Sequence, residues 1–361
     1  MLPDSAPALG LIKPSVRSQP AYTLEAPVTA RKLNQNEAPA DVPEDIKREI
    51  VSRAAAEPWH RYPAFVPHRL TAAIAARHGW MPEGVLVGNG SNELIQAALA
   101  VSVAESATVV APQPTFSLYR LLTAVNGGCY VPVPLGQAFA YDVDALIAAA
   151  RRESARVVIL NSPNNPTGSA LPEGAVERVL EETDALVLCD EAYQDFGGPS
   201  AIGLLPRFPR VIVLRTFSKA MGMAGLRFGY ALAHPDLARE IAKAKLPYNV
   251  NAITLAAAEV ALEHHRVFEE RTRAVVAERD RFVPLLALIP GIRVFPSAAN
   301  FVLFQCQAVS ARVLFRRLVE EHGILVRDVS GGVGLADCLR VSIGTREDMD
   351  ALLTAMRSLL A

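Results

Sequence analysis

One lysine occupies an unusual position in the sequence. Lys219 is the only lysine between residues 48 and 242, and it follows the apolar segment 211–214. Ser218 precedes it and Arg227 lies eight residues beyond it. An amine at the end of a buried strand, beside a hydroxyl group and a guanidinium, is suited to Schiff-base chemistry next to a bound phosphate.

Three other polar clusters also follow short apolar segments. Residues 88–93 read GNGSNE, a glycine-rich turn into a predicted helix whose free N–H groups and serine hydroxyl can hold a phosphate. Residues 161–168 read NSPNNPTG, a proline-stiffened loop that can present the Asn165 amide to a ligand. Asp190 begins the segment DEAY, directly after the apolar segment 185–189. A carboxylate at the end of a buried strand is costly to ionise without a positively charged partner. Alone, the first cluster is also consistent with a helix N-cap and the second with an ordinary turn.

The elements that position these clusters alternate from residue 69 onward. Continuous apolar strands separated by helices predict an α/β fold with a largely parallel sheet covered on both faces. Functional groups are expected in the loops at the carboxyl ends of such strands. The predicted strands are 85–87, 108–111, 129–133, 156–160, 185–189, 211–214 and 228–233, and the predicted helices are 69–78, 92–103, 118–125, 142–152 and 173–182.

The pattern changes after Pro247 and indicates a second, smaller α+β domain. We predict an N-terminal arm at 1–36, a large domain at 37–250 and a small domain at 251–361. Five prolines in the arm predict extended chain without helical or strand periodicity. The predicted elements of the small domain are a helical region at 253–288 broken near Pro284, a strand at 301–305, a helix at 309–321, strands at 324–327 and 339–343, and a helix from 346.

Composition narrows the classes of function. The chain has 361 residues, 51% of them hydrophobic and 20% charged, which excludes a disordered protein. A net charge of −1 leaves no basic excess for binding nucleic acid or an anionic membrane. No apolar run approaches the roughly 18–20 residues of a membrane-spanning helix, and the first residues lack the features of a signal peptide. The four cysteines form no CxxC pair, so we expect no metal site and a cytoplasmic protein.

Taken in order, these segments resemble the fold type I aminotransferases, and within them the histidinol-phosphate aminotransferases most closely. The resemblance implies the PLP-dependent transferase fold type I, with pyridoxal 5′-phosphate (PLP) as the cofactor. It extends from about residue 33 to the C-terminus. Its landmarks are LNQNEAP (33–39), RYP (61–63), GNGSNE (88–93), PTFSLY (114–119), NSPNNPTG (161–168), DEAY (190–193), TFSKAMGMAGLRFGY (216–230) and LRVSIGTRED (339–348).

The resemblance assigns roles around the cofactor ring. Lys219 is implied as the lysine that binds the cofactor and then moves the substrate proton. Asp190 is expected to pair with the pyridine nitrogen and keep it protonated. Tyr193 and Asn165 are expected to hydrogen-bond the ring oxygen. Phe116 is expected to stack on the ring, at a position where the family often has tyrosine.

The resemblance also assigns a phosphate site that needs two subunits. Tyr62 is expected to reach the cofactor phosphate of the neighbouring subunit, which implies a homodimer. The family often has aspartate where this chain has Asn92, whose amide and backbone N–H remain available. The phosphate ligands expected from the same subunit are Ser91, Asn92, Ser218 and Arg227, with Thr216 as a weaker candidate.

Three residues are implied in substrate binding. Arg340 matches the carboxylate-binding arginine of the family, and a planar guanidinium suits a bidentate contact with a carboxylate. Arg327 lies where histidinol-phosphate enzymes bind the substrate phosphate, although a structural salt bridge is an alternative role. Tyr22 resembles a tyrosine that closes over the substrate. The implied reaction transfers an amino group from L-histidinol phosphate to 2-oxoglutarate in histidine biosynthesis.

The sequence leaves other functions open. An aromatic amino-acid aminotransferase would keep the cofactor and leave Arg327 without a role. A PLP-dependent threonine-phosphate decarboxylase shares much of the motif set and would release CO2. A non-enzymatic sensor domain of a transcription regulator would carry a basic DNA-binding module before this region, where the sequence has only the proline-rich arm.

Overall fold

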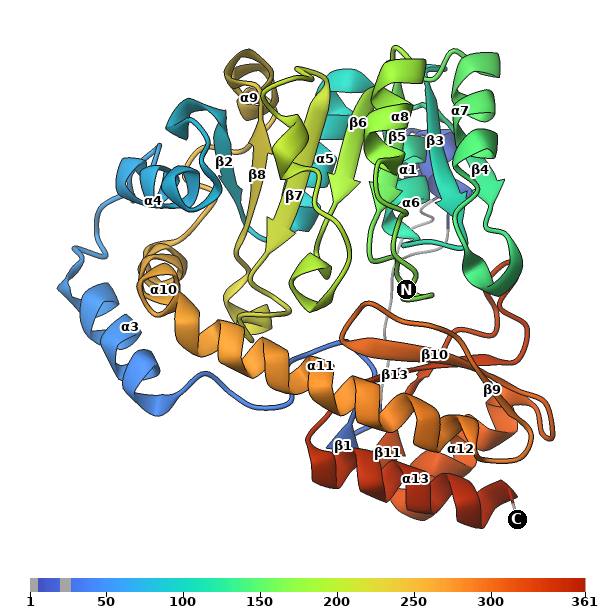
Figure 1. Ribbon diagram of the computed structural model, residues 1–361. Coiled ribbons are helices and arrows are strands. Elements are labelled where there is room, and N and C mark those ends of the chain that lie inside the picture. The colour runs from blue at the N-terminus through green and yellow to red at the C-terminus, as the bar shows by residue number, and fades with distance from the viewer. Residues whose placement is uncertain (1–5, 20–26, 361) are drawn as a thin grey trace.

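A seven-stranded sheet forms the upper half of the computed structural model in Figure 1, which describes residues 6–19 and 27–360. Its strand order is β2-β8-β7-β6-β5-β3-β4. The strands are β2 (Val85–Gly88), β3 (Thr108–Gln113), β4 (Cys129–Pro134), β5 (Val157–Asn161), β6 (Leu186–Asp190), β7 (Val211–Thr216) and β8 (Gly229–Ala233).

The sheet is largely parallel, as the sequence predicts. Strands β4, β3, β5, β6 and β7 pair in parallel, whereas β8 runs antiparallel to both of its neighbours, β7 and β2. Every residue of β5 and β7 is buried. Such strands have apolar side chains on both faces because helices cover both.

The two faces of the sheet carry separate parts of the core. In β6, Val187 packs in the cluster shared with α7 and α8, and Leu188 packs in the cluster shared with α5 and α6. This alternation follows from the two-residue period of a strand. The helices around the sheet are α4 (His68–His78), α5 (Ser91–Ser102), α6 (Leu118–Val125), α7 (Val143–Arg152), α8 (Ala175–Glu182) and α9 (Pro235–Ala242). Helix α3 (Glu44–Ala56) packs instead against α10 (Ala252–Glu263).

A four-stranded antiparallel sheet lies below the first sheet in Figure 1, with strand order β12-β13-β10-β9. Phe301 and Phe304 of its central strand are fully buried against helices of the same layer. These elements are β9 (Ile292–Val294), β10 (Phe301–Cys306), β12 (Arg327–Asp328), β13 (Cys338–Ser342), α11 (His265–Ala287), α12 (Ala311–His322) and α13 (Arg346–Leu360).

The N-terminal arm has more regular structure than the sequence predicts. It contains the short helices α1 (Ala6–Leu9) and α2 (Pro14–Arg17) and the strand β1 (Arg31–Lys32). Strand β1 pairs in parallel with β11 (Ile324–Leu325), so the arm is joined to the C-terminal part of the chain. The proposed division at residues 36 and 250 remains a prediction.

The long helical region breaks at a different place from the one predicted. It forms α10 (Ala252–Glu263) and α11, which separate at His264, and Pro284 lies inside α11. A proline removes one helical hydrogen bond, but Phe282 and Leu286 on either side are completely buried, and this packing keeps the helix continuous. The predicted strand at 324–327 was also wrong, because β11 and β12 belong to different sheets.

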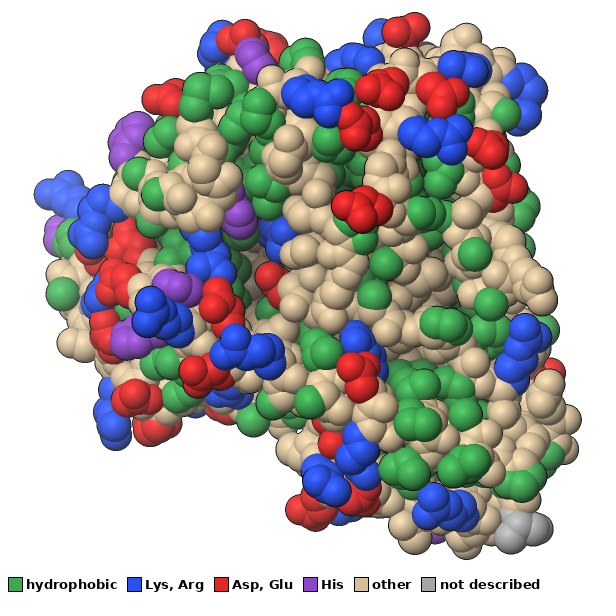
Figure 2. All heavy atoms as spheres, in the orientation of Figure 1, with side chains coloured by type: hydrophobic (Ala, Val, Ile, Leu, Met, Phe, Trp, Pro, Cys, Tyr) green, Lys and Arg blue, Asp and Glu red, His purple; other side chains and the backbone are tan. Residues whose placement is uncertain are grey.

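Charged side chains of both signs are mixed over the face drawn in Figure 2. Within residues 6–19 and 27–360, no helix combines the length and apolar character needed to cross a bilayer. Three of the cysteines are buried, and Cys129 is exposed.

Candidate active site

A cavity of about 1060 Å³ lies between the carboxyl edge of the large sheet and the small sheet. All the predicted site residues except Tyr62 and Tyr22 line this cavity. Those that line it are Ser91, Asn92, Phe116, Asn165, Asp190, Tyr193, Thr216, Ser218, Lys219, Arg227, Arg327 and Arg340.

Parallel pairing explains why segments distant in sequence meet here. Asn161 at the end of β5 is the register partner of Asp190, and Asp190 is the partner of Leu214 in β7. Strands β5 and β6 therefore end at the same level, and β7 continues to Thr216 just beyond it. The loop with Asn165, the carboxylate of Asp190 and the segment that leads to Lys219 all begin at that edge.

Asp190 is held by two donors. The Tyr119 hydroxyl donates a 2.6 Å hydrogen bond to Asp190 Oδ2, and the Ala192 N–H donates a 3.1 Å bond to Oδ1. Burial raises the pKa of Asp190, and these two hydrogen bonds oppose that rise. Sequence reasoning missed Tyr119, although it ends the quoted PTFSLY segment, three residues after Phe116. The two aromatic rings meet edge to face at 5.6 Å.

The environment of the Lys219 amine lowers its pKa well below the usual value for lysine. Its Nζ donates a 2.9 Å hydrogen bond to the Gln35 carbonyl. Removal from water, together with the positive charges of Arg340 and Arg227, lowers the pKa of Lys219 to about 7, although the negative charge of Glu37 opposes this change. A neutral amine is the nucleophilic form, so this lysine is suited to attack an aldehyde.

The phosphate site suggested by the sequence is a close-packed cradle. Helix α5 begins after Gly90, and no side chain caps its first N–H groups. Gly90 has φ +84°, and an added Cβ would overlap the Arg227 guanidinium. Arg227 Nη1 donates to Ser218 Oγ at 3.1 Å, and the Thr216 hydroxyl lies 3.0 Å from the same oxygen. A helix N-terminus, hydroxyl groups and a guanidinium are the donor set of a phosphate site, so these residues fit the cofactor.

Hydrogen bonds from nearby polar groups hold the side chains of Tyr193 and Arg340 in the cavity. Asn36 Nδ2 donates a 3.0 Å hydrogen bond to the Tyr193 hydroxyl. Arg340 donates to Asn165 Oδ1 and, at 2.7 Å, to the Asn34 carbonyl. Sequence reasoning did not assign Asn34 or Asn36, both of which lie in the LNQNEAP segment.

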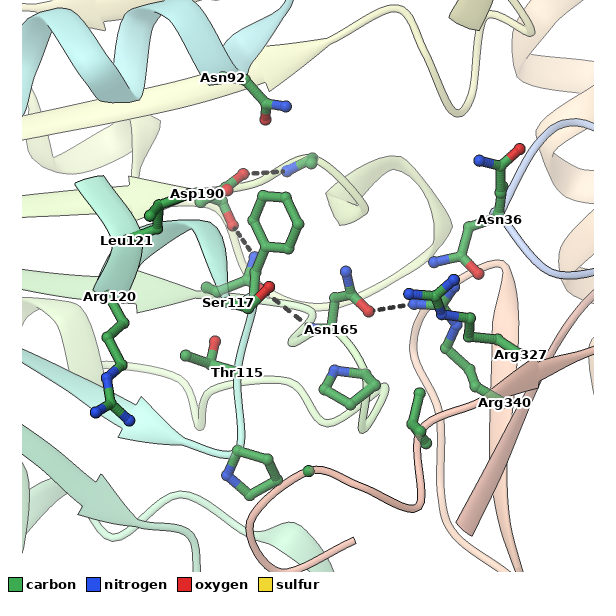
Figure 3. Close-up of a pocket in the computed structure, with 18 of the residues that line it drawn as sticks. Asn36, Asn92, Thr115, Ser117, Arg120, Leu121, Asn165, Asp190, Arg327 and Arg340 are labelled. Carbon is green, nitrogen blue, oxygen red and sulfur yellow. Dashed lines mark hydrogen bonds between the residues drawn. The ribbon is translucent and has the colours of Figure 1, made fainter. Parts of the chain in front are cut away.

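Arg327 and Arg340 are neighbours on paired strands. They are register partners in β12 and β13. Figure 3 shows both side chains at one end of the cavity, beside Asn165. Like charges directly opposite in an antiparallel pair are destabilising by themselves. The pair therefore forms a site whose charge suits a dianionic group.

Two predicted residues lie elsewhere. Tyr62 is 80% exposed and stacks on Tyr248, with ring centroids 4.6 Å apart, outside the cavity of its own chain. Its predicted role concerns a neighbouring subunit and stays a prediction. Tyr22 lies outside the described residues.

The chain is similar to known aminotransferases over nearly its whole length. The family model described as aminotransferase class I and II matches residues 30–356. A curated histidinol-phosphate aminotransferase from Chlorobaculum tepidum is 39% identical over 351 residues, covering 97% of this chain and 100% of that protein. The one from Prosthecochloris aestuarii is 39% identical over 346 residues, covering 95% of this chain and 96% of that protein. The solved structure of histidinol-phosphate aminotransferase from Sinorhizobium meliloti in complex with pyridoxal-5'-phosphate has a TM-score of 0.87 and 29% identity, with 97% of each chain covered.

The lowered pKa of Lys219 predicts how fast the cofactor-free protein captures PLP at different pH values. A pKa of about 7 makes the neutral amine about tenfold more abundant at pH 8 than at pH 6, with a plateau above pH 8. Stopped-flow absorbance should follow that curve, and Lys219→Ala should abolish capture. A rate that rises about a hundredfold over the same range without a plateau, as for a lysine with an ordinary pKa, would contradict the assignment.

The hydrogen bond from Tyr119 predicts a second effect. Tyr119→Phe removes one of the two hydrogen-bond donors to Asp190 and leaves a buried carboxylate oxygen without a partner. Such a loss typically costs about 1–3 kcal/mol, so we expect kcat to fall about tenfold. Tyr141→Phe is the matched control, because the Tyr141 hydroxyl donates to a backbone carbonyl instead. Steady-state kinetics of both variants measure the difference, and equal losses would show that Asp190 does not depend on Tyr119.

Proposed function

The chain belongs to the class I and II aminotransferase family, and we propose that it transfers the amino group of L-histidinol phosphate to 2-oxoglutarate, with PLP as the cofactor. The family match confirms the resemblance expected from the sequence. The similarity to histidinol-phosphate aminotransferases over nearly the full chain supports this substrate and a place in histidine biosynthesis. The cytoplasmic location stays a prediction.

The observation that carries the choice of substrate is the arginine pair. Arg327 and Arg340 lie opposite each other on adjacent strands and line the same cavity as Lys219. Histidinol phosphate has a dianionic phosphate and no carboxylate, while 2-oxoglutarate has two carboxylates. One site that accepts both needs two cations at the end of the cavity, and guanidinium groups bind either anion in a bidentate manner.

The other residues account for the chemistry. When bound, PLP supplies an aldehyde that accepts the amino group and a ring that withdraws electrons. The Lys219 amine is placed to accept and return the substrate proton. The Asp190 carboxylate supplies the negative charge that holds a proton on the ring nitrogen. The cradle of Ser91, Ser218 and Arg227 would hold the phosphate of the cofactor.

We further propose a homodimer. The segment around Tyr62 exposes several large aromatic side chains, and an exposed apolar patch of this kind marks an interaction surface. A second copy would cover it and could bring its tyrosine to the cofactor phosphate. The exposed fractions are 69% for Trp59, 80% for Tyr62, 68% for Phe65 and 42% for Tyr248.

Arg327→Ala tests the substrate. It should lower kcat/KM for histidinol phosphate about a hundredfold, because a desolvated charged hydrogen bond contributes up to about 3 kcal/mol, and it should change phenylalanine turnover much less. Arg293→Ala is the matched control, because Arg293 is an exposed arginine in the same sheet, on β9. Equal losses for both donors, or a wild-type preference for phenylalanine, would favour an aromatic amino-acid aminotransferase.

Mixed dimers test the shared site. Tyr62→Ala and Lys219→Ala subunits should each form inactive or weakly active homodimers. A mixed dimer would contain one site with both wild-type residues, so an equal mixture should recover about a quarter of wild-type activity. Light scattering gives the oligomeric state of each sample. Absence of recovery in a mixture shown to contain mixed dimers would place Tyr62 outside the partner's site.

A further inference from the structure

A buried ion pair lies directly beside the strand ends that carry the site. Arg215 Nη2 is 2.8 Å from Glu191 Oε2, and the two side chains are only 8% and 3% exposed. The Ser200 hydroxyl donates to Glu191 Oε2 at 2.8 Å, and the Ala201 N–H donates to Oε1 at 2.6 Å. Arg215 also contacts Asp195 at 3.3 Å. Both carboxylate oxygens therefore have partners, and the group is held in one position.

Stability alone does not explain such a pair. The cost of removing two charges from water commonly equals or exceeds their attraction. Replacing a buried ion pair by well-packed neutral residues often leaves the free energy of unfolding unchanged or increases it. Burial raises the pKa of Glu191, and the positive charge of Arg215 opposes that rise. The best-attested use of buried polar groups is to specify one arrangement among several.

The arrangement at stake is the alignment of two strands. Asp190, the last residue of β6, is the register partner of Leu214, so the next residues, Glu191 just past β6 and Arg215 within β7, lie side by side. The Glu191 N–H donates to the Leu214 carbonyl at 3.0 Å, which is the last backbone bond between these strands. Beyond it the two chains part, and the side-chain pair continues the connection.

Each member of the pair adjoins a residue of the active site. Glu191 follows Asp190, and Arg215 precedes Thr216. Because successive side chains of a strand point to opposite faces, the pair lies behind the groups that face the cofactor. The Ser218 N–H donates to Thr216 Oγ1 at 3.1 Å, so a shift of Arg215 would move the phosphate cradle as well.

Arg215, but not Glu191, also lines a second cavity of about 410 Å³. Tyr230, the β8 register partner of Arg215, shares a 2.8 Å hydrogen bond with His78 Nε2. Burial and the charges of Arg215 and Arg77 lower the pKa of His78 to about 4. His78 is therefore neutral near pH 7 and adds no positive charge beside Arg215.

We infer that Glu191 and Arg215 are positioning residues, whose ion pair fixes the ends of β6 and β7 and thereby the places of Asp190 and the phosphate cradle. Neither side chain is in the cavity that contains Lys219. The inference rests on the cofactor assignment proposed above and concerns how the fold prepares the site for it.

A double variant, Glu191→Gln with Arg215→Met, separates positioning from stability. It removes both charges, and an amide at position 191 still accepts the Ala201 hydrogen bond. The melting temperature of the cofactor-free protein should change by no more than about 4 °C. The dissociation constant for PLP, from absorbance titration, should rise about tenfold or more and kcat should fall similarly, because small displacements of catalytic groups are costly. The KM for histidinol phosphate should change little.

The control variant removes an exposed pair in the same domain. Arg178 and Asp144 lie 2.7 Å apart with side chains 49% and 82% exposed, and Asp144→Asn with Arg178→Met should leave PLP binding unchanged. A Glu191 double variant that melts and binds PLP like the wild type would overturn the inference. If it does not fold, Glu191→Asp decides, because wild-type PLP affinity in that variant would overturn the inference too. Failure of the wild type to bind PLP would instead contradict the proposed cofactor.

Discussion

The parallel alignment of β5, β6 and β7 is the constraint on which the site depends. Their parallel register brings the Asn165 loop, Asp190 and the segment before Lys219 to one edge. Each strand is buried on both faces, so its register is fixed by two hydrophobic clusters at once. A slip of one residue would turn the Asp190 carboxylate into the core.

Much of this arrangement can be predicted from the sequence, because it depends on local pattern. Apolar runs locate the strands, and polar residues at their ends locate the site. The antiparallel direction of β8 and the contact between Glu191 and Arg215 cannot be read this way, since both depend on strand order. The predicted break at Pro284 was wrong because tertiary burial on either side of this proline outweighs its local preference to end a helix. The chain breaks at His264 instead.

Residues that act through a second contact are the hardest to predict. Tyr119 reaches Asp190 from a helix 71 residues earlier in the chain, and the sequence shows only an aromatic residue on an amphipathic helix. Tyr62 is a stronger example, since its predicted role involves another chain and no distance within one chain tests it. The family resemblance supplied that role, whereas pattern and spacing did not.

Charge within the cavity connects binding to proton transfer. The charges of Arg340 and Arg227 help to lower the pKa of Lys219 in the protein alone. A phosphate bound beside Arg227 and an anion bound at Arg340 would each offset one of these charges, and so raise the affinity of the amine for a proton. In the protein without ligands, a large share of the amine is therefore in its neutral, nucleophilic form near pH 7. Occupation of both anion sites favours the protonated form of the amine. A group that transfers a proton must be able to adopt both forms.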